Sequence, residues 1–140
     1  MATYVKYEIF TQYLANKEID FFGTNDTFKA ALTSDAPVVA TDAVLADTTQ
    51  VANGGGYTTG GEDTQNDSTR TGGTVTETAV DIVWTGTTGF GPFTYVVRYD
   101  DTPTSPADPL MNYWSYGSAI SVGALETFTL DFGASVSTLT

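Results

Sequence analysis

The first twenty residues carry an apolar stripe at helical spacing. Its members recur at intervals of one, three and four residues, with polar residues between them: Val5, Ile9, Phe10, Tyr13 and Leu14. Side chains three and four positions apart lie on one face of an α-helix. The pattern predicts one amphipathic helix over residues 5–18, which ends before the turn-rich segment FFGTND.

After this segment the pattern changes to the alternation that is typical of strands. The stretch TFKAALTS predicts a strand over residues 27–34, with three apolar side chains on one face: Phe28, Ala30 and Leu32. Residues 74–140 contain several short alternating stretches separated by turns, and SVSTLT at the end predicts an edge strand over residues 135–140. We therefore expect a mainly β protein, an antiparallel β-sandwich with one N-terminal amphipathic helix.

Two of these stretches are informative about which side chains face the core. In TVTETAVDIVW the alternation places Val80, Ile82 and Trp84 on one face. In GPFTYVVRYDDTP large apolar or aromatic residues occupy every second position from Phe93 to Tyr99, which predicts a half-buried strand followed by an exit turn.

Two long stretches lack a periodic pattern. Residues 35–52 are rich in Val and Thr but not periodic, and we expect mostly loop there. Residues 53–73 are rich in Gly and small polar residues, which predicts a surface loop with at most an edge strand near residues 64–71. The whole chain, residues 1–140, is expected to form a single domain, with its main sandwich strands in residues 74–140.

Composition narrows the possible chemistry. The chain has no Cys and no His, which excludes a disulfide framework, a thiolate metal site and a Ser–His–Asp triad. Seventeen acidic residues against five basic ones give a net charge of −12. This charge opposes binding to nucleic acid or to anionic membranes, and we expect neither as a partner. The N-terminal sequence lacks a signal-peptide pattern, so we expect synthesis in the cytoplasm.

Two groups of neighbouring acidic residues are candidates either for cation ligands or for solvated turn residues. The two candidate groups are Asp100 and Asp101 with Asp108, and Glu62 and Asp63 with Asp67. Calcium loops alternate acidic residues around a fixed Gly, and neither group has that spacing. We interpret both groups as solvated turn residues and expect no metal site there.

Carboxylates and aromatic residues on the strands suggest sugar chemistry. A glycosidase would need two converging carboxyl groups, and four acids lie on predicted strands: Glu77, Asp81, Glu126 and Asp131. A sugar-stacking platform would need exposed rings, for which the candidates are Trp84, Tyr113, Trp114 and Tyr116. We interpret the four acids as solvated side chains and the rings as filling the core or an oligomer contact. We therefore expect no enzyme activity. Arg98 is expected to pair with a carboxylate.

Several stretches in order resemble one known family. These are YEIFTQYLANK, TFKAALTSDAP, ADTTQVANGGGYTTGG, GPFTYVVRYDDTP and WSYGSAISVGALETFTLDF. Their succession, over nearly the whole chain, resembles small virion proteins of tailed bacteriophages, described as head decoration or cement proteins and sometimes as tail-fibre proteins. The resemblance implies a jelly-roll β-sandwich on the outer surface of an HK97-like capsid, where it stabilises the expanded shell by bridging subunits of the major capsid protein.

The expected partners are therefore the major capsid protein and a second copy of the chain, in a homodimer rather than a homotrimer. The alternative is a trimeric tail-fibre or receptor-binding module that recognises host-surface glycans. The resemblance supplies no catalytic or cofactor-binding residues. From the sequence pattern, the candidate capsid or oligomer contacts are Val5, Ile9, Phe10, Tyr13, Tyr57, Glu62, Asp63, Asp67, Trp114 and Tyr116.

Overall fold

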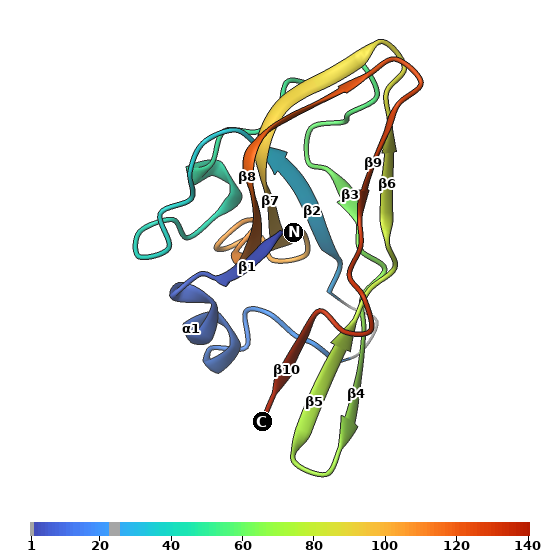
Figure 1. Cartoon of the computed structure of the whole chain (residues 1–140). Helices are drawn as coiled ribbons and strands as arrows, with labels where there is room; N and C mark the ends of the chain where they lie inside the picture. The colour runs from blue at the N-terminus through green and yellow to red at the C-terminus, as the bar shows by residue number, and fades with distance from the viewer. Residues whose placement is uncertain (1, 23–25) are drawn as a thin grey trace.

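The computed structural model describes residues 2–22 and 26–140. Over these residues the protein is mainly β, with antiparallel sheets and one α-helix, as the sequence pattern predicts (Figure 1). The longest strands are β7 (Gly89–Asp100) and β8 (Leu110–Gly123), which pair with each other along most of their length. They form the centre of the largest sheet.

The largest sheet has five strands in the order β1-β8-β7-β2-β3. β1 (Thr3–Lys6) pairs with β8 at one edge, and β2 (Phe28–Thr33) pairs with β7 on the other side. The two-residue β3 (Glu62–Asp63) completes the sheet against β2. The sheet therefore combines strands from both halves of the chain.

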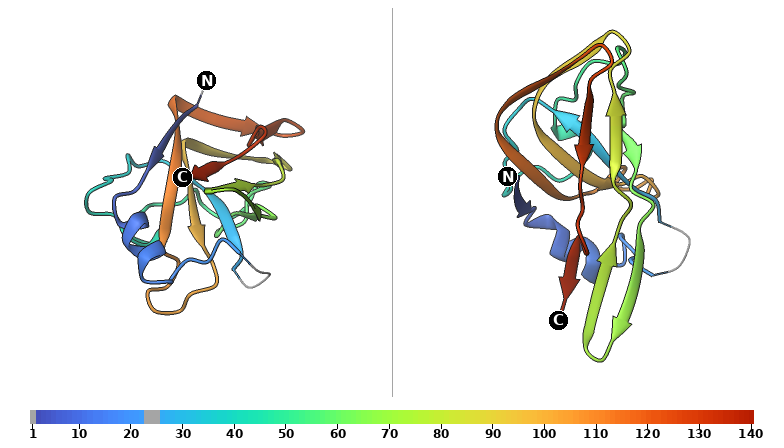
Figure 2. Two further views of the ribbon diagram at one scale, coloured as in Figure 1. Left: turned by 90° about the horizontal axis from the view of Figure 1, so that it is seen from below. Right: turned by 45° about the vertical axis from the view of Figure 1, so that its right-hand side comes forward.

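Two smaller sheets accompany it. β6 (Ile82–Thr85) pairs with β9 (Thr127–Leu130), and a three-stranded sheet has the order β10-β5-β4, formed by β4 (Asp67–Thr71), β5 (Thr74–Thr78) and β10 (Ser137–Leu139). Figure 2 shows these two sheets one above the other along the same side of the five-stranded sheet. β10 is an edge strand, as predicted, and the β4–β5 hairpin extends away from the body (Figure 1).

The main core lies where β6 and β9 face the five-stranded sheet. Trp84 of β6 and Phe93 of β7 are buried, and the Phe93 ring meets the ring of Phe128 edge to face at a centroid distance of 4.8 Å. A second cluster lies beneath the helix α1 (Ile9–Ala15) and includes Phe10 and Phe28. The contact between Phe93 and Phe128 holds the β6–β9 sheet against the five-stranded sheet, and the second cluster holds α1 against it.

The predicted helix over residues 5–18 is too long at both ends. Thr3–Lys6 forms the edge strand β1, in which Val5 is paired with Tyr113, and the helix covers only Ile9–Ala15. The unpaired edge of β8 offers backbone hydrogen bonds to a segment of β-branched and aromatic residues. Pairing with β8 therefore prevails over the helical pattern at the N-terminal end.

The Gly-rich segment is less of a surface loop than predicted. Tyr57 is only 2% exposed, and its hydroxyl donates to Gln50 Oε1 at 3.0 Å and accepts from the Leu32 N–H at 3.1 Å. Gly61, at φ +72°, passes so close to β2 that a Cβ there would lie 1.8 Å from the Ala30 carbonyl oxygen. Glycine in this segment permits close packing against the sheet.

The strand patterns at residues 74–84 and 93–99 also need correction. The first stretch breaks into β5 and β6, so that Ile82 and Trp84 are buried as predicted while Val80, between the strands, is 52% exposed. The second stretch is buried on both faces from Val96 to Asp100, because the core clusters cover β7 from both sides. Alternation alone does not reveal a strand covered on both faces.

A buried ion pair joins the three-stranded sheet to the five-stranded sheet. Arg98 of β7 and Glu77 of β5 are 1% and 0% exposed, and they form two hydrogen bonds, one from Arg98 Nη1 to Glu77 Oε2 at 3.1 Å and one from Nη2 to Oε1. Ser137 Oγ of β10 donates to Glu77 Oε2 at 2.8 Å, and the guanidinium lies over the Phe28 ring at 5.0 Å. The sequence predicts a carboxylate partner for Arg98, and the structure shows that this partner is Glu77.

Burial lowers the pKa of Arg98 to about 9, which still leaves the guanidinium charged at neutral pH. Replacing Glu77 by Leu leaves that charge buried without its partner. We expect Glu77→Leu to lower the free energy of unfolding by about 3–5 kcal/mol, measured by urea denaturation. The double variant Arg98→Met/Glu77→Leu should lose less stability than Glu77→Leu alone, because it leaves no buried charge without a partner. A loss as large as that of Glu77→Leu, or larger, would contradict the importance of the pair.

Candidate functional site

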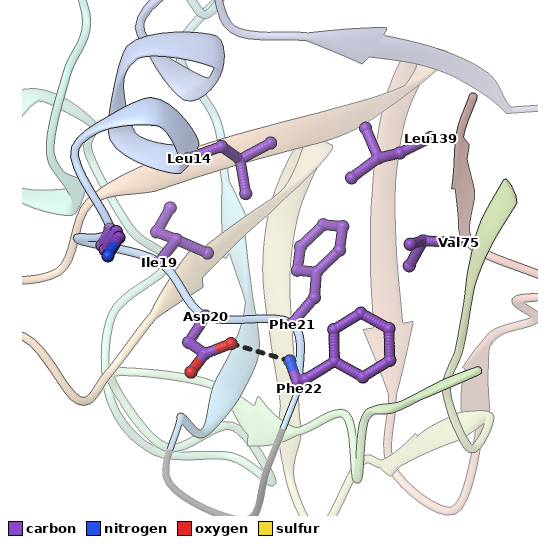
Figure 3. Close-up of a pocket in the computed structure, with 8 residues that line it drawn as sticks. Leu14, Ile19, Asp20, Phe21, Phe22, Val75 and Leu139 are labelled. Atoms are coloured by element: carbon purple, nitrogen blue, oxygen red, sulfur yellow. Dashed lines mark hydrogen bonds between the residues drawn. The ribbon is translucent and has the colours of Figure 1, made fainter. Parts of the chain in front are cut away.

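An apolar cleft opens between the end of α1 and the edge of the three-stranded sheet. It has a volume of about 480 Å³, and Ile19 and Phe21, both buried, lie at its base. Phe22 and Leu139 are 43% and 39% exposed at its margin. In Figure 3 Leu139 and Val75 face the two Phe rings across the cleft. Partly exposed large apolar side chains around a recess are typical of a binding surface.

An acidic groove adjoins this cleft. It has a volume of about 440 Å³, and it shares Lys17 and Asp20 with the cleft. Three carboxylates line it, those of Glu18, Asp20 and Asp26, against one base, Lys17. The Asp20 carboxylate also accepts the Phe22 N–H at 2.9 Å, which fixes the backbone at the boundary between cleft and groove (Figure 3).

Asp100 is fully buried next to this groove. Its Oδ1 accepts the Thr102 N–H at 3.0 Å, and the carboxyl group of Asp26, which lines the groove, is a close neighbour. Burial first, and then the neighbouring carboxyl group of Asp26, raise the pKa of Asp100 to about 8. At neutral pH the Asp100 carboxyl group therefore retains its proton.

A third groove contains two of the predicted aromatic contacts. Trp114 and Tyr116 of β8 line a recess of about 450 Å³ together with Asp131 and Phe132. The Trp114 ring meets Phe132 edge to face at 5.5 Å, and both Trp114 and Tyr116 are partly exposed. This groove and the apolar cleft have no lining residue in common.

The other predicted contacts are distributed differently. Phe10 and Tyr13 of α1 and Tyr57 are core residues, because each is at most 5% exposed, whereas Val5 and Ile9 are half-buried. The acids Glu62, Asp63 and Asp67 are exposed on β3 and β4, outside the cleft and both grooves. The structure therefore brings together Trp114 and Tyr116, but not the whole predicted set.

The four acids considered for glycoside hydrolysis each accept a structural hydrogen bond. Glu77 is paired with Arg98, and Asp81 accepts the Phe132 N–H at 2.9 Å. Glu126 and Asp131 accept N–H groups of Gly123 and Gly133, both at 2.7 Å. Three of these carboxylates thus hold turns or strand ends, and Glu77 holds the two sheets together.

Sequence reasoning singled out Leu14 in the helix stripe but missed most of the other residues of the cleft. Phe21 and Phe22 lie in a segment interpreted only as a turn, Ile19 lies just after the predicted helix, and Val75 and Leu139 lie on strands far away in the sequence. The one signal available was the pair of Phe residues in FFGTND, because large apolar side chains in a turn-rich segment need a covering surface.

Comparisons with family models, with curated proteins and with solved structures found no match for the chain. Within residues 2–22 and 26–140 there is no group of three or more acidic, His or Cys side chains placed to hold a metal ion. The same residues include no helix that is long and apolar enough to cross a membrane.

The buried carboxyl group makes stability depend on pH. The pKa of Asp100 is about 8 in the folded protein and lies near 4 in the unfolded chain, so the folded state holds the Asp100 proton more tightly. The contribution of this protonated group to the free energy of unfolding is therefore complete below about pH 4 and is lost as pH rises toward 8. We expect Asp100→Asn to match the unmodified protein near pH 4 and to exceed its free energy of unfolding by at least about 1 kcal/mol near pH 9.

The matched control is Asp101→Asn, which removes the same charge from an exposed carboxylate paired with Lys29 at 2.8 Å. This control should change the pH dependence little. If the free energy of unfolding changes with pH in the same way for all three proteins between pH 4 and pH 9, Asp100 does not retain a proton in the folded state.

Proposed function

We propose that the protein is a virion decoration protein of a tailed bacteriophage. It binds the outside of an HK97-like capsid and stabilises the expanded shell by bridging neighbouring subunits of the major capsid protein. The resemblance of the sequence to phage cement proteins suggests this role. In this proposal the sheets correspond to a jelly-roll-like sandwich in a single domain, and the protein has no enzyme activity.

The observation that carries the proposal is the presence of two separate recesses on one body. The apolar cleft beside β10 and the aromatic groove beside β9 share no residue, and each exposes large apolar or aromatic side chains. A protein that bridges two subunits needs two contact surfaces held at a fixed separation. The Arg98–Glu77 pair and the aromatic contacts between the layers provide this rigidity.

The proposed mechanism is differential affinity. A rigid bridge fits subunits only at one spacing, so it binds the expanded shell more tightly than the unexpanded one and shifts the population toward the expanded state. Many copies on one shell add their effects through avidity. The net charge of −12 steers the protein toward basic patches of the shell.

The edge strand β10 supports the expected homodimer. Its outer edge is free of any other strand within the described part of the chain, and it can pair with β10 of a second copy across a two-fold axis. The proposed location is the outer surface of the virion, after synthesis in the cytoplasm of the bacterial host.

A second candidate function is a tail-fibre or receptor-binding module that recognises host-surface glycans. The aromatic groove favours it, because Trp114 and Tyr116 lie beside the Asp131 carboxylate, and sugar sites combine aromatic rings with hydrogen-bonding acids. Counting copies in purified virions by quantitative mass spectrometry separates the two functions. A decoration protein covers the shell in many copies, whereas a fibre is present only at the tail.

The capsid proposal is tested by heating shells with and without the purified protein. Expanded shells of the phage that encodes the chain should break at a higher temperature when the protein saturates them, because binding stabilises the bound state. Light scattering and electron microscopy measure the breakage, and serum albumin at the same concentration is the control. Unchanged breakage at saturating protein would reject the proposed function.

A further inference from the structure

We propose that the apolar cleft and the acidic groove together form one docking site for a segment of the shell protein. The segment places a large apolar side chain in the cleft and a Lys or Arg side chain in the adjoining groove. This inference rests on the proposed capsid function and names the chemistry of the contact.

The apolar half of the site provides a place for an anchor side chain. Phe22 and Leu139 are more than a third exposed, although they stand next to the buried Ile19 and Phe21 (Figure 3). An apolar side chain that enters the cleft removes these exposed surfaces from water together with its own. Aromatic and aliphatic anchors in such recesses supply much of the affinity of protein interfaces.

The acidic groove favours a Lys or Arg side chain of the partner segment. Glu18, Asp20 and Asp26 line the groove, and Lys17 is the only base among its lining residues. These carboxylates repel acidic segments, phosphate groups and anionic lipid headgroups, so that charge complementarity favours a cationic protein segment. Because the groove and the cleft share Lys17 and Asp20, one continuous stretch of partner chain can occupy both.

The two halves are also held together in position. The Asp20 carboxylate accepts the Phe22 N–H at 2.9 Å, and the Asp20 N–H donates to Asp26 Oδ2 at 2.6 Å. The Phe22 backbone and the carboxylates are thereby fixed with respect to each other before a partner arrives. Such preorganisation lowers the entropic cost of binding.

Two variants test the two halves separately. Glu18→Gln/Asp20→Asn removes two charges and retains the oxygen that accepts the Phe22 N–H, while Phe22→Ala removes the exposed ring. We expect each to weaken binding to expanded shells about tenfold at low salt, measured by co-sedimentation, with a smaller loss for the charge variant at 0.5 M salt. Leu139→Ser serves as a second variant of the apolar half if Phe22→Ala fails to fold.

Matched controls carry the same changes on other surfaces. Asp81→Asn/Glu126→Gln removes two exposed charges and retains the oxygens that accept the Phe132 and Gly123 N–H groups, and Val83→Ala removes an apolar side chain on β6 that is 56% exposed. Neither should change binding by more than about twofold. If the controls weaken binding as much as the site variants, the cleft and groove are not the docking site.

Photo-cross-linking identifies the occupant directly. A photoreactive benzoyl-phenylalanine at position 22 is irradiated on expanded shells, and the attached peptide is sequenced by mass spectrometry. The inference predicts a shell-protein segment with a large apolar residue and a nearby Lys or Arg. Attachment to no segment of the shell protein, or only to a segment without a base, would overturn it.

The outcomes separate this inference from the proposed function. If the unmodified protein fails to bind or protect shells, the proposed function fails, and the inference fails with it. If the unmodified protein protects shells but all site variants bind as tightly as it does, the function stands and only the docking site is rejected.

Discussion

The contact between Arg98 and Glu77 connects two sheets that no hydrogen-bonded strand pair joins in the part of the chain that the structure describes. β5 belongs to the three-stranded sheet and β7 to the five-stranded sheet, and between them the two charges are almost completely removed from water. Burying two charges is costly, and the cost is offset only when each finds its partner in good geometry. We infer that the pair fixes the position of β5 and β10 against β7, since any other placement leaves a buried charge unpaired.

This constraint matters for binding because both candidate recesses are assembled from separate parts of the chain. The apolar cleft needs Val75 of β5 and Leu139 of β10 opposite the segment after α1, and the aromatic groove needs β8 beside the end of β9. If the three-stranded sheet moved freely, the cleft would change shape and its distance from the groove would vary. A bridge that distinguishes two spacings of shell subunits requires this distance to be fixed.

Local patterns predicted the mainly β class, the strand at β2 and the edge strand β10, because each depends on alternation within a few residues. They failed where distant segments decide the outcome. Thr3–Lys6 joins β8 as a strand, Tyr57 enters the core from a Gly-rich segment, and the cleft gathers residues from three regions. Arg98 was expected to find a carboxylate, but only the folded chain shows that the carboxylate is Glu77 and that it is buried.

The most direct test of this account is native-state hydrogen exchange on the unmodified protein. If the ion pair makes the sheets one cooperative unit, the paired amides around Glu77 in β5 should exchange with the same free energy as the slowest amides of β7 and β8. If the β5 amides exchange with a much lower free energy than those of β7 and β8, the three-stranded sheet opens on its own. That result would contradict the rigid body on which the proposed bridging depends.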